Sequence, residues 1–352
     1  MIEIEGDMLE GGGQIIRTSI SLAALTGEAV HITKIRYKRP NPGLQPQHVT
    51  AVKAIAALCD AHTAGLSQGS TELHFQPRGN KSGKFSFDVG SAGSIPLVLQ
   101  ALMPCIAFAP GQVELELTGG TDVKWSPSID YVHLVIVRTL HLMGYEINLT
   151  VNRRGHYPKG GGKVTFSTTP PRRLRPITLT KRGQLTSIEG VSHCVKLPSH
   201  VAQRQADAAK QTLTRSGCGE LRLTVESYPA GQDPHIGPGS GITLVANAQS
   251  SAIGADALGE RGKAAEQVGE EAAKKLLEEL NSQASLDRHM GDILIPYMAV
   301  AEGPSEICVS QITTHTLTNI QIAEKLLNVK FHVNGNTGQP GTISVNGVSL
   351  KT

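Results

Sequence analysis

The sequence is poor in charge, in aromatic residues and in long apolar runs. Charged residues make up 18% of the 352 residues and the formal net charge is only +3, which excludes a strongly basic, histone-like surface. No apolar stretch reaches the roughly 18 residues that a membrane-spanning helix needs. The acidic residues 1–13 differ from the basic and then apolar start of a signal peptide. We therefore expect a soluble, cytoplasmic protein.

Cysteine is also scarce, with five residues scattered along the chain and no CxxC pair. This spacing indicates neither a zinc knuckle nor a disulfide framework. Glycine is abundant at 38 residues, yet too rare for a collagen, and 39% hydrophobic residues are too many for a disordered chain. A chain of 352 residues can form two or three domains and bury a large core. The composition favours a globular α/β or α+β enzyme.

The chain repeats one pattern of helices and strands at an offset of about 80 residues. In residues 11–27 and 90–111, a glycine turn leads into an amphipathic helix. An alternating strand follows, and then a second helix that is predicted to end at Gly65 or Gly144. Two further strands complete each copy, which therefore reads as a βαβαββ unit.

A third copy is visible near the C-terminus, but it is interrupted. Its first strand is predicted at residues 176–180 and its helices at 291–303 and 314–327. Its parts are about 100 residues further apart than the repeat requires, and the segment 184–282 accounts for this excess. That segment reads as a strand, a helix, two strands and a long charged helix. Chance alternation of helices and strands is the alternative explanation.

The predicted fold class is therefore α/β (α+β). Three βαβαββ repeats would form a large domain from residues 1–183 and 283–352. A smaller α/β domain, residues 184–282, would be inserted in the third repeat. The ends of this insert should lie close together, because the third repeat must still complete its sheet.

A glycine-rich turn precedes the first predicted helix. Glu10 is followed by three glycines and Gln14, and Arg17 lies one helical turn further on. Glycines let a backbone approach a ligand closely, and a helix N-terminus offers free N–H groups to an anion. A purely structural turn explains the glycines equally well. A second glycine run, residues 155–164, fails as a P-loop because no Ser or Thr follows its glycine–lysine pair.

Two groups of cations stand out. Arg36, Lys38 and Arg39 end a predicted strand and precede a proline-rich turn, a position that suits phosphate binding. Between Ile147 and Ile188 there are nine Lys and Arg residues and no acidic residue, which makes this window a candidate contact for a nucleic-acid backbone. Few aromatic residues interleave with it, so base stacking is not indicated. Solvated surfaces are the alternative explanation for both groups.

His315 lies at the predicted start of the last helix, in the segment THTLTN. A histidine at this place is often only a neighbour of the helix cap. In a phosphate-rich cleft, its imidazole could instead attack phosphorus and form a phosphoramidate. The sequence contains 13 histidines but no GxSxG, HExxH or protein-kinase signature.

Four segments, in order, resemble those of the RNA 3′-terminal-phosphate cyclase family. They are EGGGQIIRTSISLAALTG, RYKRPNPGLQPQHVTAVKA, GHYPKGGG and THTLTNIQIAEKLL. The resemblance covers the whole chain and implies the same three-repeat fold with an inserted domain. It also implies a ligase that turns an RNA 3′-terminal phosphate into a 2′,3′-cyclic phosphate. ATP would adenylylate an enzyme histidine and release pyrophosphate, AMP would pass to the RNA phosphate, and the vicinal 2′-hydroxyl would displace AMP.

The resemblance further implies roles for individual residues. His315 would be the catalytic nucleophile, and Glu10 would hold a divalent cation, Mg²⁺ or Mn²⁺. The residues expected to bind phosphate groups are Arg17, Arg36, Arg39 and Gln47. The residues expected at the nucleoside of ATP are Gln100, His289, Met290, Gly291, Asp292 and Ile293. Ile293 departs from the family pattern, which often has Gln there, and this puts the role of its side chain in doubt.

The resemblance implies RNA 3′-phosphate ends and ATP as partners, and no membrane. Two other function classes stay open. Cyclase-like relatives in ribosome assembly are binding proteins without the catalytic histidine, but His315, Glu10 and Arg17 argue against this class. Enolpyruvyl transferases use related repeats, but they need a different active-site set and usually six repeats in a longer chain.

Overall fold

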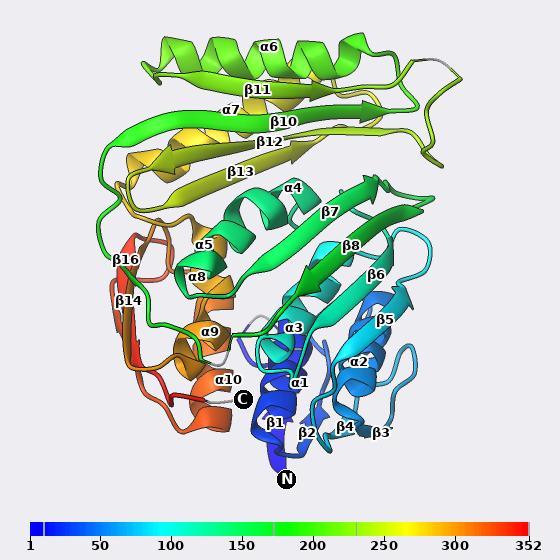
Figure 1. Cartoon of the computed structure of the whole chain (residues 1–352), viewed down its shortest axis with the longest axis vertical. Helices are drawn as coiled ribbons and strands as arrows, with labels where there is room; N and C mark the ends of the chain where they lie inside the picture. The colour runs from blue at the N-terminus through cyan, green and yellow to red at the C-terminus, as the bar shows by residue number, and fades with distance from the viewer. Residues whose placement is uncertain (10, 172, 230, 351–352) are drawn as a thin grey trace.

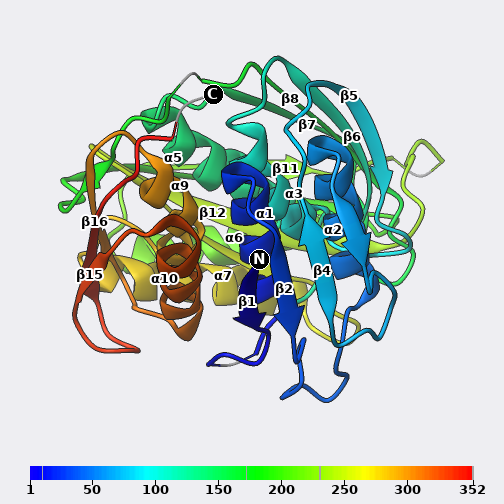
Figure 2. The same ribbon diagram turned by 90° about the horizontal axis from the view of Figure 1, so that it is seen from below.

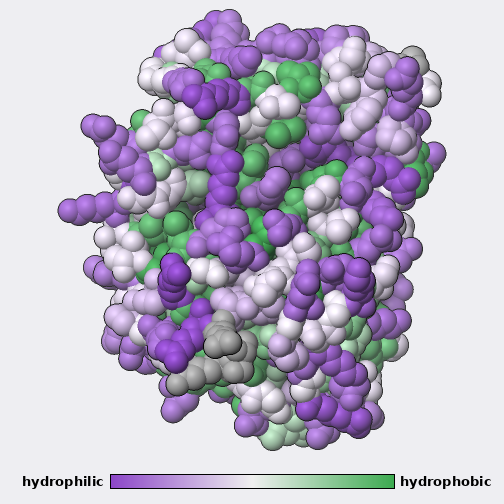
Figure 3. Space-filling model, in the orientation of Figure 1, coloured by the Kyte–Doolittle hydropathy of each residue, from purple (hydrophilic) through white to green (hydrophobic). Residues whose placement is uncertain are grey.

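The computed structural model describes residues 1–9, 11–171, 173–229 and 231–350 as a mixed α/β protein (Figure 1). In this part of the chain, sixteen strands form four mixed sheets of four strands each. Within the same residues, no helix is both long and apolar enough to cross a bilayer. The face seen in Figure 3 is mainly hydrophilic, with apolar side chains in small separate groups.

Three of these sheets share one strand order. In each, the first strand runs parallel to the second, and the second and third strands each run antiparallel to the fourth. The first sheet has the order β1-β2-β4-β3, from β1 (Ile2–Glu5), β2 (Val30–Thr33), β3 (His62–Ala64) and β4 (Leu73–Gln76). The second has the order β5-β6-β8-β7, from β5 (Gly83–Asp88), β6 (Val113–Gly119), β7 (Ile147–Arg153) and β8 (Gly162–Thr168). The third has the order β15-β16-β14-β9, from β9 (Thr178–Leu179), β14 (Pro304–Val309), β15 (Phe331–Asn334) and β16 (Gly341–Asn346).

The fourth sheet forms the upper layer of Figure 1 together with two helices. Its order is β11-β10-β12-β13, from β10 (Leu185–Val195), β11 (Leu221–Glu226), β12 (Gly239–Ala248) and β13 (Ala252–Leu258). The helices of this layer are α6 (His200–Arg215) and α7 (Ala265–Asn281). All of its elements therefore come from one continuous stretch of the chain.

The other helices lie with the first three sheets, and two of them, α4 and η1, also pack against the fourth sheet. They are α1 (Gln14–Thr26), α2 (Pro46–Cys59), α3 (Ile95–Ile106), α4 (Ile129–Tyr131), the π-helical turn η1 (Val132–Ile136), α5 (Val137–Leu142), α8 (Arg288–Ile293), α9 (Ile295–Val300) and α10 (Thr314–Leu327). Figure 2 shows α1 beside α10, although the two helices come from opposite ends of the chain. This pairing brings the glycine turn and the last helix into one place.

Buried apolar side chains form two clusters. One includes residues from Ile4 to Val345 and holds the first three sheets and their helices together. The other contains only residues between Ile188 and Leu280 and fills the space between the fourth sheet, α6 and α7. Val245 of the fourth sheet belongs to the first cluster, so the upper layer packs against the rest of the molecule.

Several local predictions are wrong. The second helix does not reach Gly65, because α2 ends at Cys59 and the residues after it pair with β4 as strand β3. Asp60, with a φ of 51°, takes the left-handed position that closes α2. The predicted helix 291–303 is divided into α8 and α9 just before Pro296. Strand β13 was not predicted, because its small residues lack the β-branched side chains that mark a strand.

Candidate active site

A cleft of about 920 Å³ lies between α1, α3, α8 and α10 on one side and the upper layer on the other. Its volume is usual for a small-molecule site. Nine of the residues predicted for the site line this cleft: Arg17, Arg36, Arg39, Gln47, Gln100, His289, Asp292, Ile293 and His315. Residues from both ends of the chain therefore meet around one volume.

The other predicted site residues differ. Glu10 lies outside the described residues. Met290 and Gly291 are buried and are not part of the cleft lining, and a Cβ on Gly291 would lie 2.9 Å from Cγ1 of Val309. α8 thus exposes residues 289, 292 and 293 to the cleft, as the spacing of one helix face requires, and turns residues 290–291 to the core.

Hydrogen bonds hold the first turn of α10, which carries His315, between α1 and α8. Thr313 caps the helix, and its Oγ1 accepts a hydrogen bond from the N–H of Thr316 at 3.0 Å. Nε2 of Gln14 donates to the carbonyl of His315 at 2.9 Å. Oδ1 of Asp292 accepts hydrogen bonds from the hydroxyls of Thr313 at 2.5 Å and Thr316 at 2.6 Å. The backbone at His315 is therefore held by contacts from two neighbouring helices.

A second chain of hydrogen bonds lies deeper between the same helices. Oγ1 of Thr18 donates to Oδ1 of Asn319 at 2.7 Å, and Nδ2 of Asn319 donates to the carbonyl of Asp292 at 2.8 Å. That carbonyl lacks its usual helical partner because Pro296, four residues later, has no N–H. Asn319 of α10 thus supplies the donor that the proline removes.

Asp287 joins three separate parts of the chain beneath the cleft. It is fully buried and caps α8, with Oδ1 accepting from the N–H groups of His289 and Met290 at 3.0 Å. The hydroxyl of Tyr131 donates to Oδ1 at 2.6 Å, and the N–H of Gly254 in β13 donates to Oδ2 at 2.9 Å. One carboxylate therefore connects the upper layer to the helix that carries His289 and Asp292.

The cleft is lined by cations and carboxylates, but the guanidinium of Arg17 has no carboxylate partner among the described residues. Burial lowers the pKa of Arg17 to about 10, and its guanidinium makes no hydrogen bond or ion pair with the residues that the structure describes. Nη1 of Arg36 donates to the carbonyls of Asn41 at 2.6 Å and Gly43 at 3.1 Å. Burial, and then the charge of Arg39, lower the pKa of Arg36. An anion bound in the cleft would compensate both the desolvation and the mutual repulsion of these cations.

His48 packs against the glycine turn. Its Nδ1 accepts from the N–H of Gln45 at 3.1 Å, so Nε2 carries the proton of the neutral ring. Burial, followed by the charges of Arg17 and Arg36, lowers the pKa of His48 to about 3. A Cβ on Gly13 would lie only 2.1 Å from Nε2 of His48. The third glycine of the turn is therefore required by this imidazole.

Sequence reasoning missed the wall that the upper layer contributes. The cleft residues from this layer are Gly254, Ala255, Asp256, Lys275, Glu278 and Glu279. β13 was not predicted, and α7 was predicted only as a long charged helix, with no role in the site. Trp125 also lines the cleft while 95% exposed, and it is the single tryptophan of the chain. Trp125 lies between β6 and α4, outside the upper layer, and sequence reasoning did not assign it to the site.

The acid-free window does not form a continuous open cationic surface. Arg154 is buried and pairs with Asp130 and Glu226, each at 2.8 Å. Lys163 pairs with Glu116 at 2.9 Å. The prediction of a nucleic-acid contact is therefore wrong for Arg154, which is buried, and stays a prediction for Lys163, whose side chain is 42% exposed.

Comparison with known proteins identifies one family. Residues 8–333 match the family model described as RNA 3′-terminal phosphate cyclase. Curated proteins of that name from Hyperthermus butylicus, Methanopyrus kandleri and Ignicoccus hospitalis are 50%, 49% and 49% identical to this chain. The alignments cover 100%, 98% and 99% of this chain and 99%, 98% and 99% of those proteins. A solved EPSP synthase from Acinetobacter baumannii has 12% identity over 99% of this chain and 65% of its own, with a TM-score of 0.31 that carries no argument.

Proposed function

The chain belongs to the RNA 3′-terminal phosphate cyclase family, and on that premise we propose that it is an ATP-dependent cyclase of RNA ends. The reaction converts an RNA 3′-terminal phosphate to a 2′,3′-cyclic phosphate and ATP to AMP and pyrophosphate. The observation that carries this proposal is the cleft that His315 shares with Arg17, a guanidinium without an anionic partner among the described residues.

In the first step, a neutral nitrogen of the His315 imidazole attacks the α-phosphorus of ATP. A nitrogen–phosphorus bond forms, the bond to the bridging oxygen breaks, and pyrophosphate leaves. Arg17, Arg36, Arg39 and Gln47 line the same cleft and are proposed to bind the phosphate groups. The hydrogen bonds from Gln14 and within the cap of α10 hold the backbone of His315 at the cleft, which is proposed to help place the imidazole for the attack.

In the second step, an oxygen of the RNA 3′-phosphate attacks the phosphorus of the histidine–AMP adduct, and His315 leaves. In the third step, the 2′-hydroxyl oxygen attacks the RNA phosphorus and loses its proton to solvent, and AMP leaves. The adenylylation is chemically necessary because a phosphate monoester has no good leaving group for this ring closure, and AMP supplies one. The same histidine is regenerated for the next turnover.

The nucleoside of ATP is proposed to lie at the other side of the cleft. Gln100 of α3 lines this side, and its amide can donate to and accept from the adenine edge. His289 and Ile293 of α8 line the cleft from the neighbouring helix. A divalent cation, Mg²⁺ or Mn²⁺, is proposed on Glu10, where it would neutralise phosphate charge when bound, since carboxylate oxygen is the ligand that these ions prefer.

The repeat arrangement is part of this proposal. The three sheets of like strand order are proposed to be three βαβαββ units of a large domain, residues 1–183 and 283–352. Residues 184–282 are proposed to be a domain inserted in the third unit. The shared strand order and the separate apolar cluster of the upper layer support this division.

The test is the formation of a labelled enzyme adduct without RNA. The protein is incubated with α-labelled ATP and the divalent cation, and the adduct is separated under denaturing conditions. The wild type should form an acid-labile, base-stable adduct, as expected for a phosphoramidate, and His315→Ala should form none. His332→Ala removes an exposed histidine of β15 outside the cleft lining and should keep the adduct.

Adduct formation by His315→Ala would show that another group is the nucleophile. A wild-type protein that binds RNA ends but never forms an adduct would instead be a binding protein of the same fold. Cyclisation is then followed on an RNA that carries a 3′-phosphate, by its loss of sensitivity to phosphatase.

A further inference from the structure

A cluster of two histidines and a carboxylate lies between the second sheet and the upper layer. Asp122 follows β6, His156 lies between β7 and β8, and His193 belongs to β10. One potential ligand atom from each residue lies within 4.8 Å of the others. Their exposed fractions are only 2%, 5% and 1%, and none of the three lines the cleft. The cluster is therefore a separate, buried group.

Most ligand atoms of this cluster make no hydrogen bond with a described residue. The two ring nitrogens of His193 each lie 3.9 Å from a carboxylate oxygen, that of Asp122 or Asp130, which is beyond hydrogen-bond distance. Both ring nitrogens of His193, Nε2 of His156 and Oδ1 of Asp122 are buried and make no hydrogen bond with the residues that the structure describes. Buried polar atoms in folded proteins almost always have a partner. Several such atoms gathered in one place indicate a shared ligand rather than a collection of separate defects.

The surrounding residues orient the cluster. Oδ2 of Asp122 accepts hydrogen bonds from Oγ1 of Thr121 at 2.7 Å and from Nη1 of Arg154 at 3.4 Å. These bonds leave Oδ1 as the atom available to a ligand. Support of this kind behind a ligating side chain is typical of metal sites, where it sets the orientation of the ligand.

Two glycines of β12 make room for the imidazole rings. A Cβ on Gly239 would lie 2.0 Å from Cγ of His156, and one on Gly241 would lie 3.0 Å from Cε1 of His193. The ring centroids of the two histidines are 5.2 Å apart. The β12 backbone thus packs directly against both rings at positions where a larger residue would not fit. This close packing is the second observation indicating that the two histidines form a defined site.

The charge around the cluster favours a dication. Arg154 makes ion pairs with three carboxylates, those of Asp122, Asp130 and Glu226. The net charge of this group is minus two when all four side chains are ionised. A divalent ion would balance the charge and occupy the unpartnered atoms together.

We propose that Asp122, His156 and His193 bind a divalent transition-metal ion of the Zn²⁺ type, which connects the upper layer to the second sheet. Two imidazole nitrogens and one carboxylate oxygen suit Zn²⁺ better than Mg²⁺ or Ca²⁺, which prefer oxygen alone. Zinc–ligand bonds are about 2.0–2.2 Å long, so two ligand atoms of a tetrahedral site are about 3.4 Å apart. The ligand atoms lie within 4.8 Å of one another, so the side chains must rotate to move them closer by up to about 1.4 Å.

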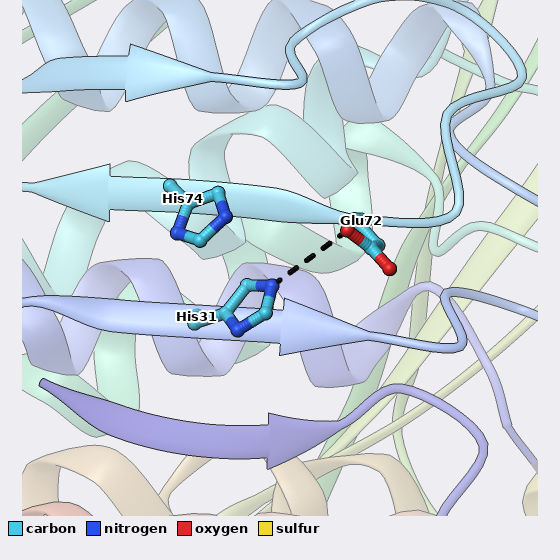
Figure 4. A group of neighbouring side chains, drawn as sticks. All are labelled: His31, Glu72 and His74. Atoms are coloured by element: carbon cyan, nitrogen blue, oxygen red, sulfur yellow. Dashed lines mark ion pairs between the residues drawn. The ribbon is translucent and has the colours of Figure 1, made fainter.

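A second cluster, on the first sheet, provides the control. His31 of β2 and His74 of β4 lie on neighbouring strands beside Glu72 (Figure 4). The two rings are stacked in parallel at 3.9 Å, and Nε2 of His31 is 3.9 Å from Oε2 of Glu72. Parallel rings direct their nitrogens alongside each other rather than toward one point, and Glu72 is 65% exposed on its side chain. This surface group fits weak binding at most.

The test measures zinc in the full-length protein without nucleotide. The protein is stripped with a chelator, reloaded with ZnCl₂, desalted and assayed for metal by mass spectrometry, and its melting is followed with and without zinc. The wild type should keep about one zinc per chain and melt at a higher temperature when loaded. Co²⁺ in place of Zn²⁺ should give the visible absorption of a low-coordinate site.

Matched variants separate this site from the others. His193→Asn and His156→Asn should lose the bound zinc and the zinc-dependent rise in melting temperature. His74→Ala, which breaks the surface cluster, and Glu10→Ala, which removes the carboxylate proposed for the nucleotide cation, should keep both. A wild type that retains no zinc and melts unchanged would overturn the proposal, as would zinc lost in His74→Ala but kept in His193→Asn. None of these outcomes depends on the proposed cyclase activity.

Discussion

Replacement of Gly13 by alanine tests the packing of the glycine turn on His48. Gly13 has a φ of −65°, which any residue adopts, so an alanine there causes no backbone strain. Its Cβ would however lie 2.1 Å from Nε2 and 2.8 Å from Cε1 of His48, whereas ordinary contacts begin at 3.4 Å. The overlap is about 1.3 Å, too large for small adjustments of the ring.

The expected cost follows from the position of His48. The side chain is 3% exposed and its Nδ1 is held by the N–H of Gln45, so the ring cannot turn away without losing that bond. Overpacking in a core costs about 1–3 kcal/mol, and a lost hydrogen bond about 0.5–1.5 kcal/mol. We therefore expect Gly13→Ala to lower the free energy of unfolding by about 2–4 kcal/mol. Adenylylation should fall as well, because Arg17 follows Gly13 by one helical turn.

A double-mutant cycle provides the assay. Urea unfolding is measured for the wild type, Gly13→Ala, His48→Ala and the double variant. In the His48→Ala background the methyl group has room, so most of the cost of Gly13→Ala should disappear, with a coupling energy of about 2 kcal/mol. The control is Gly219→Ala, at an exposed glycine where a Cβ would have no atom within 4 Å, and it should change stability by less than about 0.5 kcal/mol.

A Gly13→Ala variant as stable as the wild type would refute this explanation of the glycine. An equal cost of the substitution with and without the imidazole would refute it too. In either case the glycine would serve the ligand or the helix start rather than the packing of His48.

Three further predictions concern the charges of the cleft. His48 is neutral in the folded protein, with a pKa of about 3, but takes up a proton near pH 6.5 when unfolded, so the unfolded state binds more protons between these values. The contribution of His48 to stability should therefore fall by about 1.4 kcal/mol per pH unit as the pH drops from about 6.5 toward about 3. Urea unfolding of the wild type and of His48→Gln over a series of pH values measures this contribution as the difference between the two proteins. An imidazole that titrates near its ordinary pKa by NMR would contradict the prediction. Arg17→Met should raise the free energy of unfolding without nucleotide by on the order of 1 kcal/mol, because a buried charge without a partner is removed, while adduct formation falls about 10²-fold; a loss of both stability and activity would indicate a structural role instead. Glu10→Ala should weaken the metal dependence of adenylylation more than it weakens stability, and an unchanged metal titration would exclude the carboxylate as the ligand.

The elements with strong local signals were predicted well. The last helix was expected at residues 314–327, which are the bounds of α10, and Thr313 before it is a typical N-cap. The C-terminal glycine of α1, Gly27, also takes the expected left-handed conformation, with a φ of 74°. In these places, the conformation depends on residues within one or two helical turns.

Where tertiary pairing determines the structure, the local signals were misleading. Gly65 is a plausible end for α2, but the strand β3 that precedes it exists only because β4 lies beside it. β13 is made mostly of small residues, and it pairs with β12 along its whole length. In both cases the partner is the neighbouring strand along the chain, but the composition of β3 and β13 does not mark either segment as a strand.

The same distinction applies to the site. Residues 289, 292 and 293 could be placed on one helix face from their spacing, and they line the cleft together. The donor that Asn319 gives to the carbonyl of Asp292 could not be predicted, because it depends on the approach of α10 to α8. The cation content of the window before Ile188 was misleading for Arg154, since its partner Glu226 lies in the upper layer.

The carboxylate of Asp287 has a consequence for the exchange of segments between related proteins. The upper layer leaves and re-enters the rest of the chain as one continuous stretch, which makes it an obvious cassette for chimaeras. However, the backbone N–H of Gly254 in this layer donates to the carboxylate of Asp287. The same carboxylate caps α8 and accepts a hydrogen bond from the Tyr131 hydroxyl. A graft that shifts β13 by one residue would leave Asp287 with an unfilled oxygen directly beneath His289. An upper layer taken from a related protein must therefore fit the Tyr131 and Asp287 side chains of the chain that receives it, and not only the sequence at the points where the two chains are joined.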